Sequence, residues 1–290
     1  MELRHLRYFL AVAENCHFRH AAEELLVSQP TLTQQIKDLE KELKTPLFER
    51  VGRRVRLTQA GETFRDYARR SLNVIEEGKA ALHEFGELLR GNLTLGVVQT
   101  VNAYLTPKVI AEFVTRYPHV LLRVEELSAA EIEAGVSSGK LDLGIAFSPK
   151  NERDLLAEPL FEEELVLMVQ HGHRLAKRKT LSAKSLADEP LCLLRSSYGT
   201  RQMIDAWFSA SGYVPRLAVE MNSVEGLLAV TTAGGPATIL PTLATQDKRI
   251  ATVRLVQPTP ARTVCLLKSQ GDLPFRARDK FVELLKQEIA

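Results

Sequence analysis

Residues 18–43 constrain the fold more than any other segment, because they predict two short helices joined by a tight turn. Ser28 follows the turn as a favourable N-cap, since its hydroxyl can accept from an unpaired amide of the next helix. Pro30 lies in the first turn of that helix, where its missing N–H costs nothing. The apolar positions of each helix form one stripe: Ala21, Ala22 and Leu25 in the first, and Leu32, Ile36, Leu39 and Leu43 in the second.

The side of the second helix opposite its stripe is polar. Pro30, Gln34 and Lys37 point away from the stripe, and Gln29 and Thr33 flank it. Gln and Thr at the start of a helix can donate and accept hydrogen bonds at base edges in the major groove. Helical hairpins with a polar outer face also occur in proteins that do not bind DNA, so the helices alone leave both interpretations open.

A basic hairpin is predicted directly after the helix pair. Residues 47–58 indicate two short strands around Gly52, with four arginines close together: Arg50, Arg53, Arg54 and Arg56. Such a wing suits phosphates and the minor groove. The clustering carries this interpretation, because the net charge of +2 says little about partners.

Short motifs in this region resemble those of the LysR-type bacterial transcriptional regulators: residues 28–36 (SQPTLTQQI), 39–40 (LE), 46–50 (PLFER) and 56–61 (RLTQAG). The resemblance extends over the whole chain and is most specific in the first 61 residues. Residues 199–205 (GTRQMID) and 220–225 (EMNSVE) look closest to the cyanate-operon regulator branch. One departure concerns Gln34, where many relatives have Arg, and Thr33, where Ser is common; it tilts the base preference toward adenine.

The resemblance implies a regulator that binds double-stranded operator DNA and a small-molecule effector, works with RNA polymerase, and assembles as a homodimer or homotetramer. The residues expected to contact DNA lie in the second helix and the wing: Ser28, Gln29, Pro30, Thr33, Gln34, Lys37, Arg50, Arg53 and Arg54.

The length of 290 residues suggests two or three domains, and 45% apolar residues are enough for sizeable cores. We expect a winged helix-turn-helix domain over residues 1–58, with its helix-turn-helix at 18–37 and a first helix through Leu3, Leu6, Leu10 and Ala13. A linker helix, with Thr58 as its candidate N-cap, is expected over 59–90. Its stripe of apolar residues favours a partner helix in a dimer over packing on its own domain: Phe64, Ala68, Ile75, Leu82, Phe85 and Leu89.

After a predicted hinge at residues 90–92, strands alternate with helices, which predicts a mainly parallel sheet covered on both faces. The fold class is therefore α + α/β, with an effector-binding domain over 91–290. The family has a periplasmic-binding-protein-like arrangement of two α/β lobes with a cleft between them. Lobe 1 is expected at about 91–163 and 267–290, and lobe 2 at about 164–266. The expected strands are 93–97, 120–125, 141–146, 165–169, 191–194, 217–220, 237–240 and 264–267.

Ligands of open α/β sheets bind at the carboxyl ends of strands, beside helix N-termini. Thr100 and Thr200 are the best candidates, because they match effector positions of the family, one in each lobe. Hydroxyls, amides and helix-start N–H groups suit a small anion such as a carboxylate, although simple N-capping is the alternative for each Ser or Thr. The full candidate set is Gln99, Thr100, Ser128, Phe147, Ser148, Gly199 and Thr200.

We expect a cytoplasmic, ligand-responsive LysR-type activator with no cofactor, no metal and no catalytic residue. The longest early apolar run, residues 8–13, is too short for a membrane span and makes a poor signal peptide. Cys16, Cys192 and Cys265 form no CxxC pair. The alternatives are a redox-responsive regulator using Cys192 and Cys265, and a solute-binding protein or an enzyme on the same lobes. An enzyme needs a nucleophile–base pair or a metal cluster, and we find neither pattern.

Overall fold

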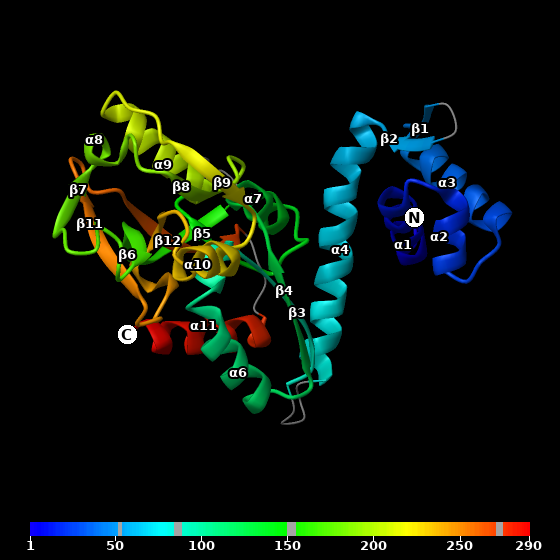
Figure 1. Cartoon of the computed structure of the whole chain (residues 1–290). Coiled ribbons are helices and arrows are strands. Elements are labelled where there is room, and N and C mark those ends of the chain that lie inside the picture. The colour runs from blue at the N-terminus through cyan, green and yellow to red at the C-terminus, as the bar shows by residue number, and fades with distance from the viewer. Residues whose placement is uncertain (52–53, 84–88, 150–154, 271–274) are drawn as a thin grey trace. The chain divides into compact units, whose positions relative to one another are not determined.

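The computed structural model describes residues 1–51, 54–83, 89–149, 155–270 and 275–290 (Figure 1). The chain forms two compact units, which we describe separately. The first unit is Met1–Glu87 with Ser138–Lys140, and the second is Leu88–Ser137 with Leu141–Ala290. Within the described residues, no helix combines the length and apolarity needed to cross a membrane.

The first unit contains the predicted helix-turn-helix. Ser28 caps the second of the two helices, because its Oγ accepts from the Thr31 amide at 3.2 Å, and Pro30 lies in the first turn. The apolar stripe faces inward, with Leu32, Ile36 and Leu39 buried. The elements are α1 (Leu3–Asn15), α2 (Phe18–Glu24), α3 (Gln29–Leu43), β1 (Phe48–Val51) and β2 (Arg54–Leu57). The predicted helices and the hairpin after them are thus confirmed.

An aromatic cluster and a carboxylate hold the hairpin on the helices. The ring of Phe9 lies 5.3 Å from that of Phe48 and 5.0 Å from that of Phe64, between ring centroids. Glu40 Oε1 accepts from the amides of Leu47, at 2.7 Å, and Phe48, at 3.0 Å. Helix α3 therefore fixes the start of β1 as well as the apolar core.

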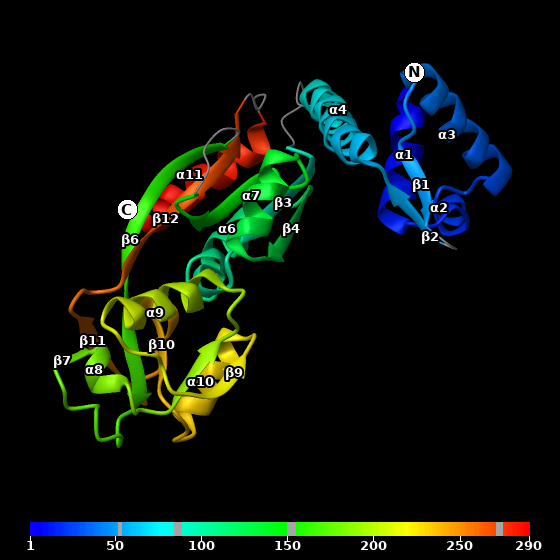
Figure 2. The same ribbon diagram turned by 90° about the horizontal axis from the view of Figure 1, so that it is seen from above.

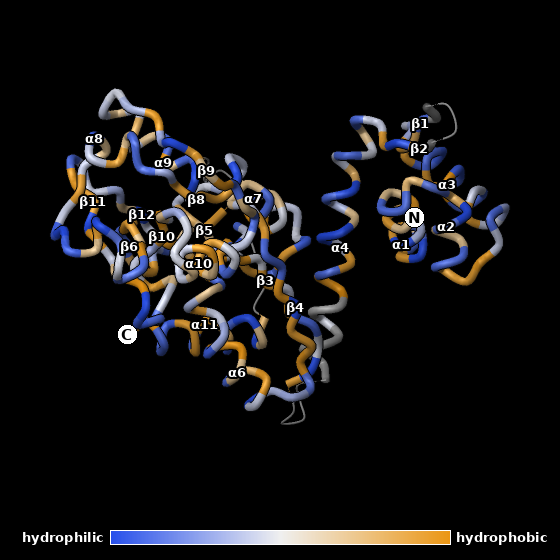
Figure 3. Tube along the Cα trace, in the orientation of Figure 1, coloured by the Kyte–Doolittle hydropathy of each residue, from blue (hydrophilic) through white to orange (hydrophobic). Residues whose placement is uncertain are grey.

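Helix α4 (Gln59–His83) follows the hairpin, and the hydroxyl of Thr58 accepts from the Gly61 amide at 3.0 Å, as a cap does. The predicted continuation to about residue 90 includes Phe85, which lies outside the described residues, and the side chain of Leu82 is not described. Figure 3 shows hydrophobic and hydrophilic segments alternating along α4. Phe64, Ala68 and Leu72 pack into the core of the first unit. Part of the stripe thus packs within its own unit, as the alternative interpretation held.

The main sheet of the second unit has the strand order β4-β3-β5-β12-β6-β11-β7, with β10 also paired to β6. Its strands are β3 (Gly91–Val97), β4 (Val120–Glu126), β5 (Leu143–Phe147), β6 (Leu155–Gln170), β7 (Thr180–Ser182), β10 (Thr238–Pro241), β11 (Ile250–Val256) and β12 (Ala261–Ser269). A separate parallel pair is formed by β8 (Leu191–Leu194) and β9 (Leu217–Met221). Strand β3 begins at Gly91, so the expected hinge residues Gly91 and Asn92 belong to the sheet.

The prediction of parallel strands is confirmed for β3, β4 and β5, but the sheet as a whole is mixed and not mainly parallel. Strand β3 is parallel to β4 and β5, but β12 is antiparallel to β5 and β6, and β6 is antiparallel to β10 and β11. The reason is that β6 and β12 cross between the lobes in opposite directions. Parallel neighbours need a crossover connection, usually a helix, to return the chain to the same end of the sheet. Antiparallel neighbours such as β6 and β12 need no such connection, so the alternation of strands and helices does not predict their direction.

Strand β6 is much longer than the predicted 165–169, and it joins two lobes. Its first residue, Leu155, is buried in one core, whereas Leu165, Leu167 and Val169 are buried in another. Figure 2 shows β6 passing from one lobe to the other. We call the part built on β3, β4 and β5 lobe 1, and the part built on β7 to β11 lobe 2.

Helices alternate with the strands in both lobes, as predicted. Ser223 caps one of them, its Oγ accepting from the Gly226 amide at 3.0 Å. Phe281, Leu284 and Leu285 of the last helix are buried. The helices are α5 (Gln99–Asn102), α6 (Thr106–Arg116), α7 (Ala129–Ser137) and α11 (Arg276–Ile289) in lobe 1, and α8 (Ala183–Leu186), α9 (Gly199–Ala210) and α10 (Val224–Thr232) in lobe 2.

Candidate functional site

The exposed face of α3 holds most of the predicted DNA-contacting residues. Gln29, Pro30, Gln34 and Lys37 are exposed, and Thr33 is half-buried. Ser28 is exposed as well, but its hydroxyl is used as the helix cap and lies 2.7 Å from the Thr31 hydroxyl. The structure therefore places four polar or proline side chains on the solvent-exposed face of α3.

The amide of Gln34 has a partner that the sequence did not suggest. Its Nε2 donates to Asp38 Oδ1 at 2.9 Å, one turn further along α3. This bond leaves Oε1 and one N–H of Gln34 open, and that pair matches the bidentate pattern of adenine in the major groove.

The predicted wing forms, with Arg50 in β1 and Arg54 in β2. Their backbones pair with Val55 and Val51 respectively. Arg53 lies outside the described residues, and nothing is described of the side chains of Arg50 and Arg54. Arg56, on β2, is exposed.

Thr100 and Thr200, predicted as effector contacts from the two lobes, are brought to one buried side chain. Both threonines are almost fully buried. Arg262, on β12, donates from Nη2 to Thr100 Oγ1 at 2.9 Å and from Nη1 to Thr200 Oγ1 at 2.6 Å. One guanidinium therefore bridges the starts of α5 and α9.

The charge of Arg262 is balanced by Glu163, a residue of β6. Arg262 Nε donates to Glu163 Oε1 at 2.6 Å, and both side chains are buried. Tyr104 donates its hydroxyl to the other carboxylate oxygen, Oε2, at 2.6 Å. The ring of Phe147 lies against the guanidinium, with its centroid 3.9 Å from Cζ. We call Thr100, Tyr104, Glu163, Thr200 and Arg262 the Arg262 network.

Burial and charge act in opposite directions on this network. Burial lowers the pKa of Arg262, while the Glu163 carboxylate and Tyr104 raise it. A guanidinium starts so far above neutral pH that it stays charged. Burial and, next, the Glu163 carboxylate raise the pKa of Tyr104, so the phenol keeps its proton and donates. The hydroxyls of Thr100 and Thr200 both accept from the guanidinium, so the buried cation is satisfied by two hydroxyls and one carboxylate.

Three further predicted residues lie around this network. Gln99 Nε2 donates to the Asn222 carbonyl of lobe 2 at 2.5 Å, and its buried Oε1 has no hydrogen-bond partner. Phe147 contacts Arg262 as described above. A Cβ on Gly199 would lie 3.0 Å from Phe147 Cε2, so glycine allows this close approach. The structure therefore gathers five of the seven candidates: Gln99, Thr100, Phe147, Gly199 and Thr200.

The two secondary candidates have other partners. Ser128 Oγ donates to Glu131 Oε2 at 2.6 Å and accepts from the Glu131 amide at 3.3 Å, which is the capping alternative. Ser148 is exposed, and its Oγ lies 3.5 Å from Cys265 Sγ.

Sequence reasoning missed Arg262, Glu163 and Tyr104. A signal existed for the first, because Arg262 shares a strand face with Val264 and Leu266, which are fully buried. An arginine in a buried period-2 position needs a carboxylate, and residues 162–164 are all glutamate. Nothing in the sequence singles out Tyr104.

The remaining chemistry-bearing residues are explained structurally. Within the described residues, no group of three His, Cys, Asp or Glu side chains could hold a metal ion. His173 Nε2 lies 3.2 Å from Glu189. Cys192 and Cys265 are buried in separate apolar clusters, and burial raises the pKa of the Cys192 thiol. The redox alternative is therefore not favoured, because a reactive cysteine needs an accessible thiolate.

Comparison with known proteins agrees with this arrangement. Residues 3–62 match the family model of the bacterial regulatory helix-turn-helix protein, lysR family, and residues 86–290 match the LysR substrate binding domain. The DNA-binding transcriptional dual regulator OxyR of Escherichia coli is 33% identical over 282 residues, covering 96% of this chain and 92% of the relative. The transcriptional activator CmpR of Synechocystis is 29% identical and covers 78% of this chain and 74% of the relative.

Solved structures of full length are similar too. A full-length OxyR from Pseudomonas aeruginosa has a TM-score of 0.75 and 28% identity, covering 100% of this chain and 94% of that one. CbnR complexed with its target DNA has a TM-score of 0.68 and 26% identity, covering 99% and 100%. Both family models, the matching folds and the winged helix-turn-helix lead to one conclusion: this chain belongs to the LysR family of DNA-binding transcriptional regulators.

Proposed function

We propose that this regulator is a cytoplasmic activator that acts on RNA polymerase and responds to a small anion held between the two lobes. The Arg262 network is the observation that carries the effector part. It joins a buried cation to one hydroxyl from each side of the cleft. Regulation rather than catalysis is its role, and we propose no cofactor, metal or catalytic residue.

The DNA-binding part uses α3 and the wing on double-stranded operator DNA. Gln29, Thr33 and Gln34 read base edges, since they lie on the open face of α3. Arg50, Arg53 and Arg54 of the wing hold phosphates or the minor groove, and Ser28, Pro30 and Lys37 position the helix. The similarity to CbnR, which was solved with its target DNA, supports this assignment.

Two heads are needed for paired half-sites, so the chain acts as a homodimer or homotetramer, and α4 supplies the pairing helix. Tyr67 and Val74 support this proposal, because they are apolar side chains of α4 that are 60% and 45% exposed.

In the lobes, the anion forms an ion pair with Arg262 and replaces part of the interaction of Arg262 with Glu163. Gln99 supports this site, because its Oε1 is buried without a partner. Turning its amide offers Nε2 to an anion at the cost of the bond to the Asn222 carbonyl. Phe147 and Gly199 shape the site, and Ser128 and Ser148 stay secondary candidates. A ligand held by both lobes favours one lobe angle, and it shifts that equilibrium only by its differential affinity for the two states.

Calorimetry with a panel of small mono- and dicarboxylates tests the effector site. Thr100→Val and Thr200→Val keep the side-chain shape and remove one hydroxyl each. We expect the best wild-type ligand to lose about tenfold or more in affinity in each variant, because a hydrogen bond to a charged group contributes about 1.5–3 kcal/mol. Thr115→Val is the matched control, since Thr115 is exposed on α6 and donates to the Ala111 carbonyl. Unchanged affinity in both cleft variants would contradict the assignment.

A further inference from the structure

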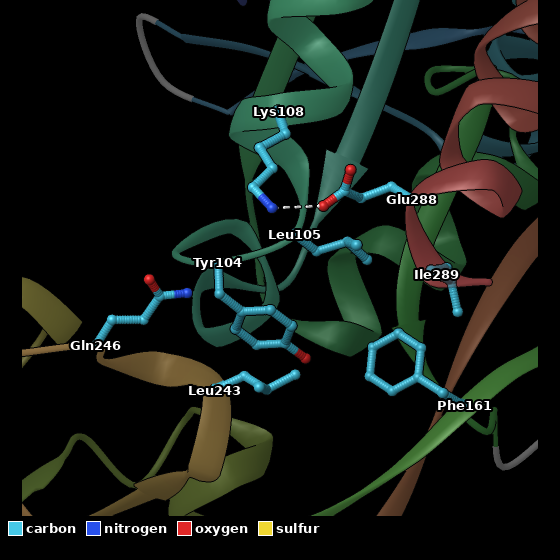
Figure 4. Close-up of a pocket in the computed structure, with 8 residues that line it drawn as sticks. All are labelled: Tyr104, Leu105, Lys108, Phe161, Leu243, Gln246, Glu288 and Ile289. Carbon is cyan, nitrogen blue, oxygen red and sulfur yellow. Dashed lines mark hydrogen bonds and ion pairs between the residues drawn. The ribbon is translucent and has the colours of Figure 1, made fainter.

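A groove of about 500 Å³ lies on lobe 2, between helix α10 and the segment that leads into β11. It shares no residue with the pocket of Figure 4, which Tyr104 of lobe 1 and Leu243 of lobe 2 line together with other residues. One face of α10 lines the groove, at positions i, i+3, i+4, i+7 and i+8: Glu225, Leu228, Ala229, Thr232 and Ala233. This face follows the helix axis for about 12 Å, so the groove has room for an extended small molecule.

The middle of the groove is lined by small and aliphatic side chains. Ala229 is exposed on α10, and its single methyl group leaves open the space that a longer side chain would fill. Leu228 is half-buried, and Ile250, the first residue of β11, is buried. Apolar surface of a ligand displaces water favourably from such side chains. This part of the groove therefore suits an aliphatic chain.

The wall formed by the segment before β11 carries an ion pair whose two charges satisfy each other. Arg249 Nε donates to Asp247 Oδ1 at 3.0 Å, and its Nη2 donates to Oδ2 at 2.6 Å. The Arg249 amide also donates to Oδ1, at 2.9 Å. These bonds lower the pKa of Asp247 to about 2 and raise the pKa of Arg249, so both groups stay charged and the pair has no net charge.

Glu225 carries the charge that is left over. Two of the described residues that line the groove are acidic and one is basic, so the lining has a net charge of −1. Glu225 is exposed in the first turn of α10, and its Oε2 accepts from the Ser223 hydroxyl at 2.9 Å. Among the described residues, none donates to its Oε1 or forms an ion pair with it. A carboxylate oxygen that is open in this way is a good acceptor for an ammonium group.

We propose that the groove binds a small primary amine, with its ammonium group on Glu225 and its aliphatic chain along Leu228, Ala229 and Ile250. An anion is disfavoured, because Glu225 repels it and the only cation described on the lining is already paired. Thr232, half-buried on the same face of α10, offers a hydroxyl to one further polar group of the ligand. The ligand has the opposite charge to the anion proposed between the lobes, and its site shares no residue with the Arg262 network.

The first test uses the full chain and three probes with the same carbon chain, 1-aminopentane, 1-pentanol and pentanoate, in calorimetry at neutral pH and low salt. We expect saturable binding of the amine. The alcohol should bind about threefold more weakly, because an ion pair at an exposed site contributes little. Pentanoate should bind about tenfold more weakly than the amine, since it meets a like charge. No saturable binding of the amine, or tighter binding of pentanoate, would overturn the proposal.

A charge variant tests the role of Glu225. Glu225→Gln can still accept from the Ser223 hydroxyl, but it should weaken the amine about threefold, so that amine and alcohol bind alike. Asp188→Asn is the matched control, because Asp188 is an exposed carboxylate of lobe 2 that does not line the groove. Equal effects of the two substitutions on the amine would contradict the contact with Glu225.

A second variant fills the groove. Ala229→Leu should weaken the amine by about tenfold or more, and α10 should keep its stability because alanine and leucine both favour helices. Ala111→Leu is the control, since Ala111 is exposed on α6 and does not line the groove. Thermal unfolding curves check that both variants are folded. If Ala229→Leu leaves amine binding unchanged and instead lowers the mass in sedimentation, the groove is an interface between copies of the chain and the proposal is wrong.

Discussion

The two units of this regulator bury different kinds of side chain. In the first unit, every side chain described as buried is apolar, and polar groups lie at its surface. The second unit buries an arginine, Arg262, with Glu163 and two threonines between its lobes. An apolar core has one best packing, whereas a buried polar network depends on every partner being present. Under the proposed function, the first unit reads DNA with a fixed surface, and a charged ligand acts on the buried polar network of the second.

The largest expected effect comes from removing the buried charge in the second unit. Arg262→Met leaves Glu163 buried without its cation, so the free energy of unfolding of this unit should fall by about 3–5 kcal/mol. Urea unfolding followed by the fluorescence of Trp207, the only tryptophan and a buried residue of lobe 2, measures it. Trp207 also donates to the Pro258 carbonyl at 2.6 Å, close to the start of β12.

Two variants check the cause of that loss. Arg262→Met combined with Glu163→Leu removes both charges and should recover much of the stability, because no unpaired charge stays buried. Arg19→Ala breaks an exposed ion pair with Glu23 in the first unit and should cost about 0.5 kcal/mol or less. If Arg262→Met lowers the free energy of unfolding only slightly, or if the double variant recovers none of it, buried charge does not distinguish the two units.

The second prediction concerns the first unit as a reader of bases. Gln34→Ala should weaken binding to the preferred operator by about 1–3 kcal/mol and relax the preference at one base pair. Arg53→Ala should instead weaken binding to all sequences alike and lower the salt slope by about 1, if its contact is to phosphate. Titrations on matched and scrambled duplexes at several salt concentrations separate the two.

Asp38→Asn sharpens this second prediction. The asparagine can still accept from Gln34 Nε2 but carries no charge near the phosphates, so affinity should rise on both duplexes without loss of preference. If Gln34→Ala weakens matched and scrambled duplexes equally, Gln34 does not read a base and the description of α3 as a fixed reading surface loses its main support.

The sequence predicted the first unit well because its signals are local. Ser28, Pro30 and the stripe of α3 act within one or two helical turns, and the structure has them as expected. In the second unit, Thr100 and Thr200 were predicted as effector contacts from strand ends and from the family resemblance, and the structure brings their hydroxyls to one guanidinium. The residue that connects them was not predicted, because Arg262 pairs with Glu163 across 99 positions of the chain. The antiparallel pairs of the sheet were not predicted for the same reason, since the pairing of β12 with β6 is set by packing and not by any local pattern.

The smallest expected effect lies at the turn between α2 and α3. Leu26 has a φ of 54° and is 93% exposed, so a branched side chain sits in the left-handed region with little to pack against. That conformation costs a non-glycine residue about 1–2 kcal/mol, while glycine loses about 0.5–1 kcal/mol in extra freedom of the unfolded chain. Leu26→Gly should therefore stabilise the first unit by about 0.5–1 kcal/mol, measured as slower hydrogen exchange of the α3 amides.

Lys41→Gly is the control for this last prediction, because Lys41 is exposed inside α3, where glycine costs about 1 kcal/mol. If Leu26→Gly stabilises the first unit and Lys41→Gly destabilises it, the first unit carries a strained backbone at its surface. The second unit carries a buried charge instead. If Leu26→Gly instead destabilises α3 by as much as Lys41→Gly, Leu26 makes contacts that outweigh its backbone strain. The turn would then belong to the apolar core and not to the strained surface of the reader.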